Sequence, residues 1–438
     1  MMPITSILCG ALLAQNTITP APPQAAPLVI EHATIHTAVL GASVIQDGFV
    51  VIDGGKIVSM GTGAAPASAA ACIDATGLHL TPGFISTATT LGLIETGQVR
   101  ATDDRTETGR FHPEVEAWLA INPDSNLLPV ARMGGVLLAL VFPQGGVVSG
   151  QASLIRLDGW TNDEIAAVRD AGTVVRWPAT EPAPHWYTTR NADQQEKDRR
   201  ATLRALDDFF DAAKAYTRAR AADPALPVDL RFERMRDLLD GTRPLFIEAA
   251  SAGQIESAIL WSLARSMKPI IVGGQGALAV ADLLVKYKVP VIVPGVLRLP
   301  RFAHDDYDAP YTLPARLAAR GIEFAIATGD EPSNDRNIAH HAAVAAAFGL
   351  APEEALASIT RVPAQLAGVG DAYGVIAAGH SATLLLHDGD PLEVTTNVRQ
   401  AWIDGRSIEL KSHQTDLKAK YEHKYQRPQP VPAATPAP

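Results

Sequence analysis

Hydrophobic and polar positions near both ends of the chain follow the two-residue period of β-strands. "LVIEHATIHT" (28–37) and "GFVVIDGGKIVSMG" (48–61) are short apolar runs with partial alternation, and "DGG" at 53–55 is typical of a hairpin turn. Residues 374–410 return to the same kind of pattern, in "GVIAAGHSATLLLHDGDPL" and "VRQAWIDGRSIEL". These stretches predict a small β-rich unit at each end of the chain.

The central part of the chain has a different rhythm from residue 81 onward. Continuously apolar strand-like runs alternate with helix-like stretches of about 10 to 15 residues, which is typical of a parallel sheet covered by helices. Over nearly 300 residues this alternation predicts an α/β fold with a closed (β/α)8 TIM-type barrel at 81–374. A charged stretch at about 193–240 with helical spacing is predicted as a helical insertion on the barrel.

The two termini differ from the rest in composition. Residues 4–14 are an apolar run of the length of a signal-peptide core, which predicts a signal peptide at 1–14 and an exported protein, periplasmic or secreted. No Lys or Arg precedes this run, and the alternative is a cytoplasmic protein whose N-terminal segment is not a signal. Residues 15–27 are predicted as a Pro/Ala linker, and residues 413–438 as a Pro-rich tail.

Charge and cysteine content narrow the class of partner. The formal net charge is −10 and no dense basic patch is present, which argues against a nucleic-acid partner. Beyond the N-terminal run, no apolar stretch is long enough to predict membrane insertion. Only Cys9 and Cys72 occur, so the sequence does not predict a cysteine-built zinc site. The partners that these observations leave open are a small-molecule ligand and further copies of the chain in a homo-oligomer.

Three motifs resemble the amidohydrolase superfamily, specifically its imidazolonepropionase-like branch. They are "DATGLHLTPGFIS" (74–86), the segment 349–392 that contains "GVIAAGHSATLLLHDGDPL", and "VRQAWIDGRSI" (398–408). The resemblance implies a composite β-sandwich domain made of residues 28–80 and 375–412, joined to the barrel. It also implies zinc or another divalent metal at the barrel mouth, held by histidines from strands one, five and six and an aspartate from strand eight.

The metal-ligand positions of the family are substituted in this sequence. Where the family has "PGxIDxHxH", residues 82–90 read "PGFISTATT", which puts Ala88 and Thr90 at the two histidine positions. The later histidines align with Ala250 and near Gly273. Asp330 is a candidate for the strand-eight acid, although Gly329 is an alternative match. We therefore expect no bound metal and no other cofactor.

Other side chains are candidates for a substitute site. Glu248 lies on a predicted strand and is a candidate to pair with Asp330 in a catalytic role, if its side chain faces the barrel lumen. His304 and Asp305 follow a predicted strand and are candidate ligand contacts, against the alternative of a polar turn. Ser149 and Gln151, in a glycine-rich stretch, are also candidate ligand contacts, against the alternative of a structural turn.

Two functions fit these observations. In the first, the chain is a pseudoenzyme: an amidohydrolase-like barrel without the family's divalent-metal site, which acts by binding a ligand or partner. In the second, it is a hydrolase of carbon–nitrogen bonds, on cyclic amide or dipeptide-like substrates, with a displaced or metal-free site. Loss of imidazole at every matched position favours the first.

Overall fold

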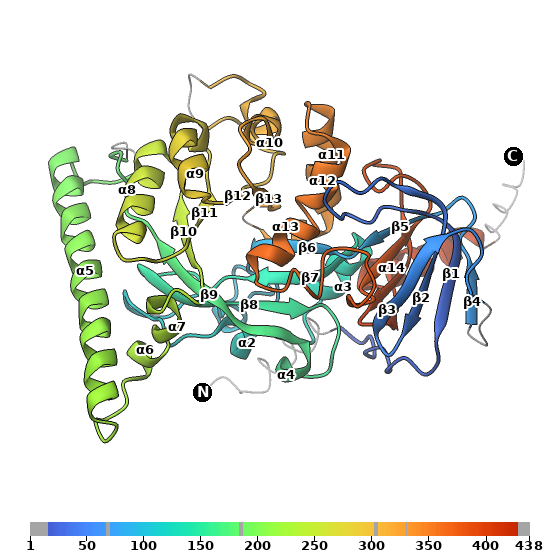
Figure 1. Ribbon diagram of the computed structural model, residues 1–438, viewed down its shortest axis with the longest axis horizontal. Helices are drawn as coiled ribbons and strands as arrows, with labels where there is room; N and C mark the ends of the chain where they lie inside the picture. Colours follow the sequence, from blue (N-terminus) through green and yellow to red (C-terminus); the bar gives the residue numbers. More distant parts are fainter. Residues whose placement is uncertain (1–15, 67–70, 184–186, 302–304, 330, 428–438) are drawn as a thin grey trace, which may run out of the picture.

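The computed structural model describes residues 16–66, 71–183, 187–301, 305–329 and 331–427. Within these ranges the strands form two sheets of eight (Figure 1). The terminal sheet contains β1 (Leu28–Ile35), β2 (Ile45–Asp53), β3 (Lys56–Thr62), β4 (Ala71–Asp74), β5 (His79–Pro82), β14 (Leu384–His387), β15 (Val398–Ile403) and β16 (Arg406–Ile408). The barrel sheet contains β6 (Phe84–Thr89), β7 (Val136–Val141), β8 (Val148–Arg156), β9 (Ala166–Arg176), β10 (Leu245–Ala249), β11 (Pro269–Gly273), β12 (Val291–Val293) and β13 (Phe324–Ile326).

The helices lie mostly between and after the barrel strands. They are α2 (Ala117–Ala120), α3 (Leu127–Met133), α4 (Asn162–Ile165), α5 (Ala192–Ala222), α6 (Leu230–Glu233), α7 (Arg236–Leu239), α8 (Ala252–Leu263), α9 (Ala281–Tyr287), α10 (Ala309–Ala319), α11 (Ile338–Ala347), α12 (Pro352–Ala357), α13 (Arg361–Leu366) and α14 (His413–Gln426). Short 3₁₀ turns are η1 (Arg100–Thr102), η2 (Ala277–Val280) and η3 (Pro332–Asn337).

The terminal sheet is built from both ends of the chain. Its strand order is β16-β15-β14-β5-β1-β2-β3, with β4 paired to β1. The two ends meet where β5 runs antiparallel to β14 and Leu80 lies opposite Leu386. Both leucines belong to a buried cluster that also contains Ile52 and Trp402. The pairing therefore gives one composite sheet, and the sandwich of two packed sheets stays a prediction.

The barrel sheet departs from uniform strand–helix alternation at one point. Its order is β13-β12-β11-β10-β9-β8-β7-β6, and all neighbours are parallel except that β8 is antiparallel to both β7 and β9. Residues 142–147 connect β7 to β8, with Gly145 and Gly146 at φ +88° and +62°. A connection this short makes a hairpin, since a parallel crossover needs a dozen residues or more. The prediction of eight parallel strands is wrong here.

The outermost strands of the barrel sheet, β6 and β13, are joined by the turn between α12 and α13. The amide of Ile85 in β6 donates to the carbonyl of Ile359 at 2.8 Å, and the amide of Ile326 in β13 donates to the carbonyl of Ser358 at 3.0 Å. Helix α13 packs against both strands. The turn thus fills the seam of a nearly closed barrel, and it satisfies backbone groups that an open edge would expose.

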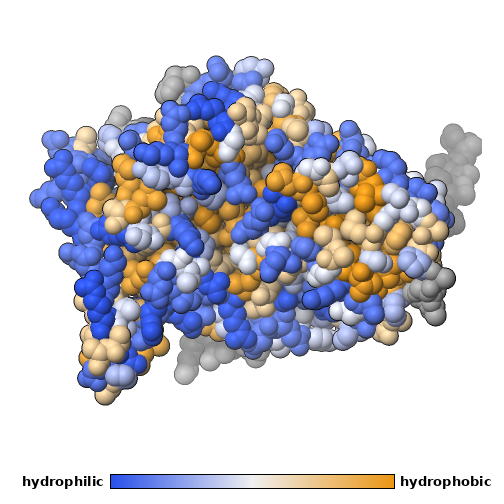
Figure 2. Space-filling view, in the orientation of Figure 1, coloured by the Kyte–Doolittle hydropathy of each residue, from blue (hydrophilic) through white to orange (hydrophobic). Residues whose placement is uncertain are grey.

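The predicted helical insertion contains one long helix and two single-turn helices. Helix α5 begins at a capping box in which Asn191 and Gln194 satisfy each other's backbone N–H groups. Only Leu206, Phe210 and Ala213 of its 31 residues are buried. The part of the α5 surface that is visible in Figure 2 is largely hydrophilic. Helix α5 therefore packs on the barrel along a narrow stripe.

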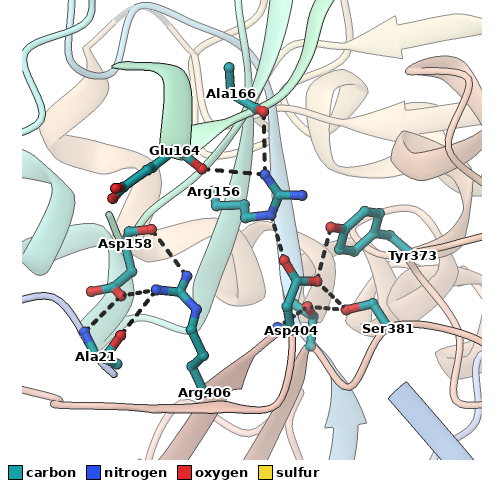
Figure 3. Close-up of polar contacts among 10 residues, drawn as sticks. Ala21, Arg156, Asp158, Glu164, Ala166, Tyr373, Ser381, Asp404 and Arg406 are labelled. Atoms are coloured by element: carbon teal, nitrogen blue, oxygen red, sulfur yellow. Dashed lines mark hydrogen bonds and ion pairs between the residues drawn. The ribbon is translucent and has the colours of Figure 1, made fainter. Parts of the chain in front are cut away.

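A buried aspartate ties the barrel to the terminal sheet. Asp158, just after β8, accepts from Arg132 of α3 at 2.7 Å and from Arg406 of β16 at 3.0 Å. It also accepts from the backbone N–H of Ala21 at 3.0 Å (Figure 3). The side chains of Asp158 and Arg132 are 3% and 4% exposed, so both charges depend on one another for compensation.

A second aspartate, Asp404, also connects the barrel to the terminal sheet. Asp404, in the turn between β15 and β16, accepts from the Nε of Arg156 in β8 (Figure 3). The hydroxyls of Tyr373 and Ser381 donate to its other oxygen at 2.9 and 2.6 Å. Burial and this carboxylate raise the pKa of Tyr373 to about 12. The two aspartates together fix the C-terminal hairpin against the barrel.

Both terminal segments contain more contacts than the sequence predicts. In the linker, the amide of Asn16 donates to Asp124 and the side chain of Gln24 bonds to Ile52. In the tail, residues 413–426 form helix α14, which begins at a capping box on Ser412. The predicted signal peptide lies outside the described residues, so export stays a prediction. Among the helices described, none combines the length and apolarity that crossing a membrane requires.

Candidate functional site

A cavity of about 660 Å³ lies at the mouth of the barrel. It is lined by the carboxyl ends of all seven parallel strands of the sheet and by the β7–β8 hairpin. The lining residues from these strand ends include Ala88, Thr90, Phe142, Arg176, Glu248, Ala250, Gly273, Pro294 and Gly329. This is the face of an α/β barrel on which active sites are found. We call it the mouth cavity.

The four positions that align with the family's histidines all lie on the wall of the mouth cavity. Ala88 and Thr90 come from the end of β6, Ala250 follows β10 and Gly273 ends β11. The register of β6 against β7 shifts between Thr87 and Thr89, and Ala88 has φ +52°. A non-glycine residue in this region is uncommon and marks a local bulge. The four aligned positions therefore share one cavity, and the side chains there are small.

The described residues around the mouth cavity do not supply a set of ligands for a divalent metal. A structural or catalytic zinc needs at least three protein ligands from imidazole, thiolate or carboxylate. None of the four aligned side chains supplies one, and no group of three or more His, Cys, Asp or Glu within the described ranges is placed to hold an ion. Gly273 has φ +108°, and a Cβ there would lie 3.0 Å from the carbonyl oxygen of Ala249. The backbone at this position disfavours any side chain, including histidine.

Charged groups on the wall are arginines and one glutamate. Glu248 of β10 accepts from the Nε of Arg176 in β9 at 2.9 Å, so its carboxylate is already compensated by a guanidinium. Arg298 and Arg301, which follow β12, also line the cavity. The Nε of Arg298 donates to the carbonyl of Gly295 at 2.8 Å. Within the described lining, cationic groups therefore outnumber anionic ones.

The other candidates from the sequence are distributed differently. Asp330 and His304 lie outside the described residues. Asp305 lines a second cavity beside the mouth cavity. Ser149 donates to the carbonyl of Gly145 at 2.7 Å, and Gln151 donates to the carbonyl of Pro113 at 2.7 Å. Both side chains are buried and neither lines the mouth cavity, and their contact with a ligand stays a prediction.

One buried carboxyl escaped the sequence analysis. Asp335 of η3 is fully buried and accepts from the hydroxyls of Thr89 at 2.6 Å and Thr328 at 2.5 Å. Burial raises its pKa to about 6, against the opposing effect of these hydrogen bonds. In sequence, "EPSNDRN" is typical of an exposed polar loop, and no local signal indicates that its aspartate faces inward.

His341 is a second buried titratable group near the mouth. It lies on α11, is 4% exposed, and its Nδ1 accepts from the amide of Leu297 at 3.4 Å. Burial and the nearby Arg298 lower its pKa to about 4. His341 is therefore neutral at physiological pH and supports the loop that carries Arg298, and it is not on the wall of the mouth cavity.

Comparisons with known proteins agree with this architecture. No family model matches the chain. Amidohydrolase tasK of Hapsidospora irregularis is 24% identical over 377 residues, which are 76% of this chain and 36% of tasK. Imidazolonepropionase of Chromobacterium violaceum is 40% identical over 88 residues, which are 19% of this chain and 21% of that enzyme. The chain thus spans about a third or less of the length of these relatives.

The fold has a solved counterpart. The crystal structure of an amidohydrolase from Thermotoga maritima MSB8 superposes with a TM-score of 0.77 at 24% identity, over 87% of this chain and 99% of that one. Lower similarity extends to molinate hydrolase, with a TM-score of 0.54 at 16% identity, over 95% of this chain and 98% of that one. Taken together, these similarities in sequence and fold support the amidohydrolase superfamily as the group of proteins that this chain resembles.

Proposed function

We propose that this chain is a pseudoenzyme of the superfamily, which binds a small-molecule ligand in the mouth cavity without a divalent metal. One observation carries the proposal: the four positions that align with the family's histidines lie on one cavity wall and hold Ala88, Thr90, Ala250 and Gly273. In metal-dependent hydrolysis the ion lowers the pKa of a bound water so that hydroxide attacks the substrate. Methyl, hydroxyl and hydrogen in place of imidazole leave no donor set for such an ion.

The cavity is nevertheless built to hold a ligand. Its volume, about 660 Å³, is within the range of small-molecule sites. Its wall combines small side chains with the amides of Gln144, Gln254 and Gln275 and with arginines. A few polar groups among other lining side chains can fix the orientation of a bound molecule.

The alternative function is hydrolysis of a carbon–nitrogen bond at a displaced or metal-free site. Two observations favour keeping it: the relative tasK is named an amidohydrolase, and Glu248 lies on the cavity wall. Against it, the carboxylate of Glu248 is already engaged by the guanidinium of Arg176 at 2.9 Å.

Metal analysis of the purified full chain separates the two functions. The chain is incubated with zinc, manganese or iron, and the unbound metal is removed by dialysis. We expect far less than one equivalent of metal to remain bound. We also expect no turnover of imidazolone, hydantoin or Xaa-Pro dipeptide substrates. About one tightly held equivalent per chain, lost on Glu248→Gln or Asp330→Ala, contradicts the proposal. Glu256→Gln, on an exposed position of α8, is the matched control. Turnover without metal that Glu248→Gln abolishes, and Glu256→Gln does not, supports the alternative.

A further inference from the structure

A second cavity adjoins the mouth cavity and shares a wall with it. Each has a volume of about 660 Å³, and both are lined by Gln275, Pro294, Arg298 and Arg301. The second cavity continues outward between η2 and α10. Its lining includes Leu278, Ala279, Leu299, Pro310 and Leu313, with Glu181, Asp305 and Arg316 also on its wall. The shared wall is therefore polar and cationic, and the space beyond it is mainly apolar.

Arg298 is the half-buried cation at the junction of the two cavities. Its Nε is anchored on the carbonyl of Gly295 at 2.8 Å. Its Nη2 lies 3.2 Å from the place that a Cβ on Gly329 would occupy. The absence of a side chain at position 329 leaves the guanidinium next to open space in the mouth. A guanidinium held by its Nε presents its outer N–H groups as a fork, which matches the two oxygens of a carboxylate.

Two buried polar atoms on the same walls have no hydrogen-bond partner within the described part of the chain. They are the hydroxyl oxygen of Thr90, a residue that is 3% exposed, and Oε1 of Gln275. Leaving a buried polar atom unpaired is unfavourable, because the atom has lost its hydrogen bond to water without gaining another. Thr90 lines the mouth cavity and Gln275 lines both cavities, so a polar ligand toward which these side chains turn recovers this free energy. This observation is independent of the charge of Arg298.

We propose that the two cavities form one site for an amphipathic organic anion. Its carboxylate pairs with Arg298 at the shared wall, its polar atoms face Thr90 and Gln275, and its apolar chain extends into the second cavity toward Leu278 and Leu313. This inference rests on the proposed function, because it takes the mouth cavity as a place for a ligand instead of a metal. It adds the chemical class of that ligand.

Calorimetric titration of the full chain with three probes tests the inference. Octanoate carries both the carboxylate and the chain, octanamide removes the charge, and acetate removes the chain. We expect octanoate to bind, and octanamide and acetate to bind at least about tenfold more weakly. Arg298→Gln is expected to weaken octanoate about tenfold or more and to leave octanamide unchanged. Ala279→Phe, which narrows the exposed rim of the second cavity, is expected to remove the advantage of octanoate over acetate.

The matched control is Arg399→Gln, on β15 of the terminal sheet, where Arg399 pairs with Asp388 on the surface. We expect this variant to bind octanoate like the parent chain, and thermal unfolding establishes that each variant is folded. Equal affinity for octanoate and octanamide, no effect of Arg298→Gln, or no binding of any probe overturns the inference. Binding of octanamide alone overturns it while the ligand-binding function stands. A tightly held metal with amide hydrolysis overturns the proposed function, whatever the anion results.

Discussion

The carboxylate of Asp335 accepts a hydrogen bond from the hydroxyl of Thr89 at 2.6 Å, and this contact joins the end of the first barrel strand to η3, which follows the last strand. A second bond from Thr328 completes the connection at the seam of the barrel. Thr89 lies between Ala88 and Thr90, the two residues at the histidine positions of the family. The seam is therefore held by hydrogen bonds beside the place where the resemblance implies a metal.

Replacing Asp335 is expected to change how stability depends on pH. Burial raises the pKa of Asp335 from an ordinary 3.8 to about 6. The folded state therefore gains most from this group below pH 3.8, and the gain is lost as pH rises through about 6. A shift of about two units corresponds to about 3 kcal/mol. We expect the unfolding free energy of the parent chain, relative to Asp335→Asn, to fall by up to that amount between about pH 4 and pH 8.

Urea unfolding of both proteins at a series of pH values measures this difference. Asp282→Asn is the control, since the Asp282 side chain is 96% exposed and pairs with Arg320 on the surface. Its difference from the parent chain is expected to be small at every pH. Parallel pH profiles for the parent chain and Asp335→Asn contradict the prediction.

Removing the carboxylate of Asp158 is expected to destabilise the connection between barrel and terminal sheet. In Asp158→Ala, the guanidinium of Arg132 stays buried without its partner, and Arg406 and the amide of Ala21 also lose an acceptor. Breaking a buried pair in this way costs about 3–5 kcal/mol. Chemical unfolding measures the loss.

The matched control is Asp163→Ala, which removes a partner of Arg169 at the surface. The two side chains of that pair are 69% and 55% exposed, and such pairs contribute about 1 kcal/mol or less. If Asp158→Ala costs no more than Asp163→Ala, the buried aspartate does not hold the two units together.

A side chain at position 273 is expected to be costly in itself. In Gly273→Ala, a residue with a Cβ must adopt φ +108° and approach the carbonyl of Ala249 to 3.0 Å. Strain of this kind costs of order 1–3 kcal/mol. Gly97→Ala is the control, because a Cβ at Gly97 meets only Ile94 at 4.0 Å. Thermal unfolding of both variants decides: equal melting temperatures contradict the view that the backbone of β11 excludes a histidine.

Local sequence patterns predicted much of the fold. The apolar runs at 136–142, 244–250 and 268–274 coincide with β7, β10 and β11. The pairing of the two ends was implied by the resemblance. In the structure, β5 and β14 form this pair. The β7–β8 hairpin was missed because an apolar run indicates burial and not the direction of its neighbour. Helix α14 was missed because a polar segment without an apolar face carries no periodic signal, although Ser412 caps it.

The candidate site was predicted only in part, for a physical reason. Alignment placed Ala88, Thr90, Ala250 and Gly273, because each lies at or next to the end of a recognisable strand. Arg298 and Asp335 lie in irregular loops whose course depends on the packing of the whole barrel. Nothing in their local sequence indicates that one lines the cavity and the other is buried.

By itself, the sequence determined most of the strands and helices, the β-rich character of both ends, and the absence of imidazole at Ala88, Thr90, Ala250 and Gly273. Each of these depends on residue type or on short-range periodicity. Only the tertiary structure decided that the end of β6 meets Asp335, which is 246 residues from Thr89 in the chain. It also decided that Arg298 lies at the junction of two cavities. Closure of the barrel brings distant strand ends into one ring, and local sequence does not encode which loops then face the same space.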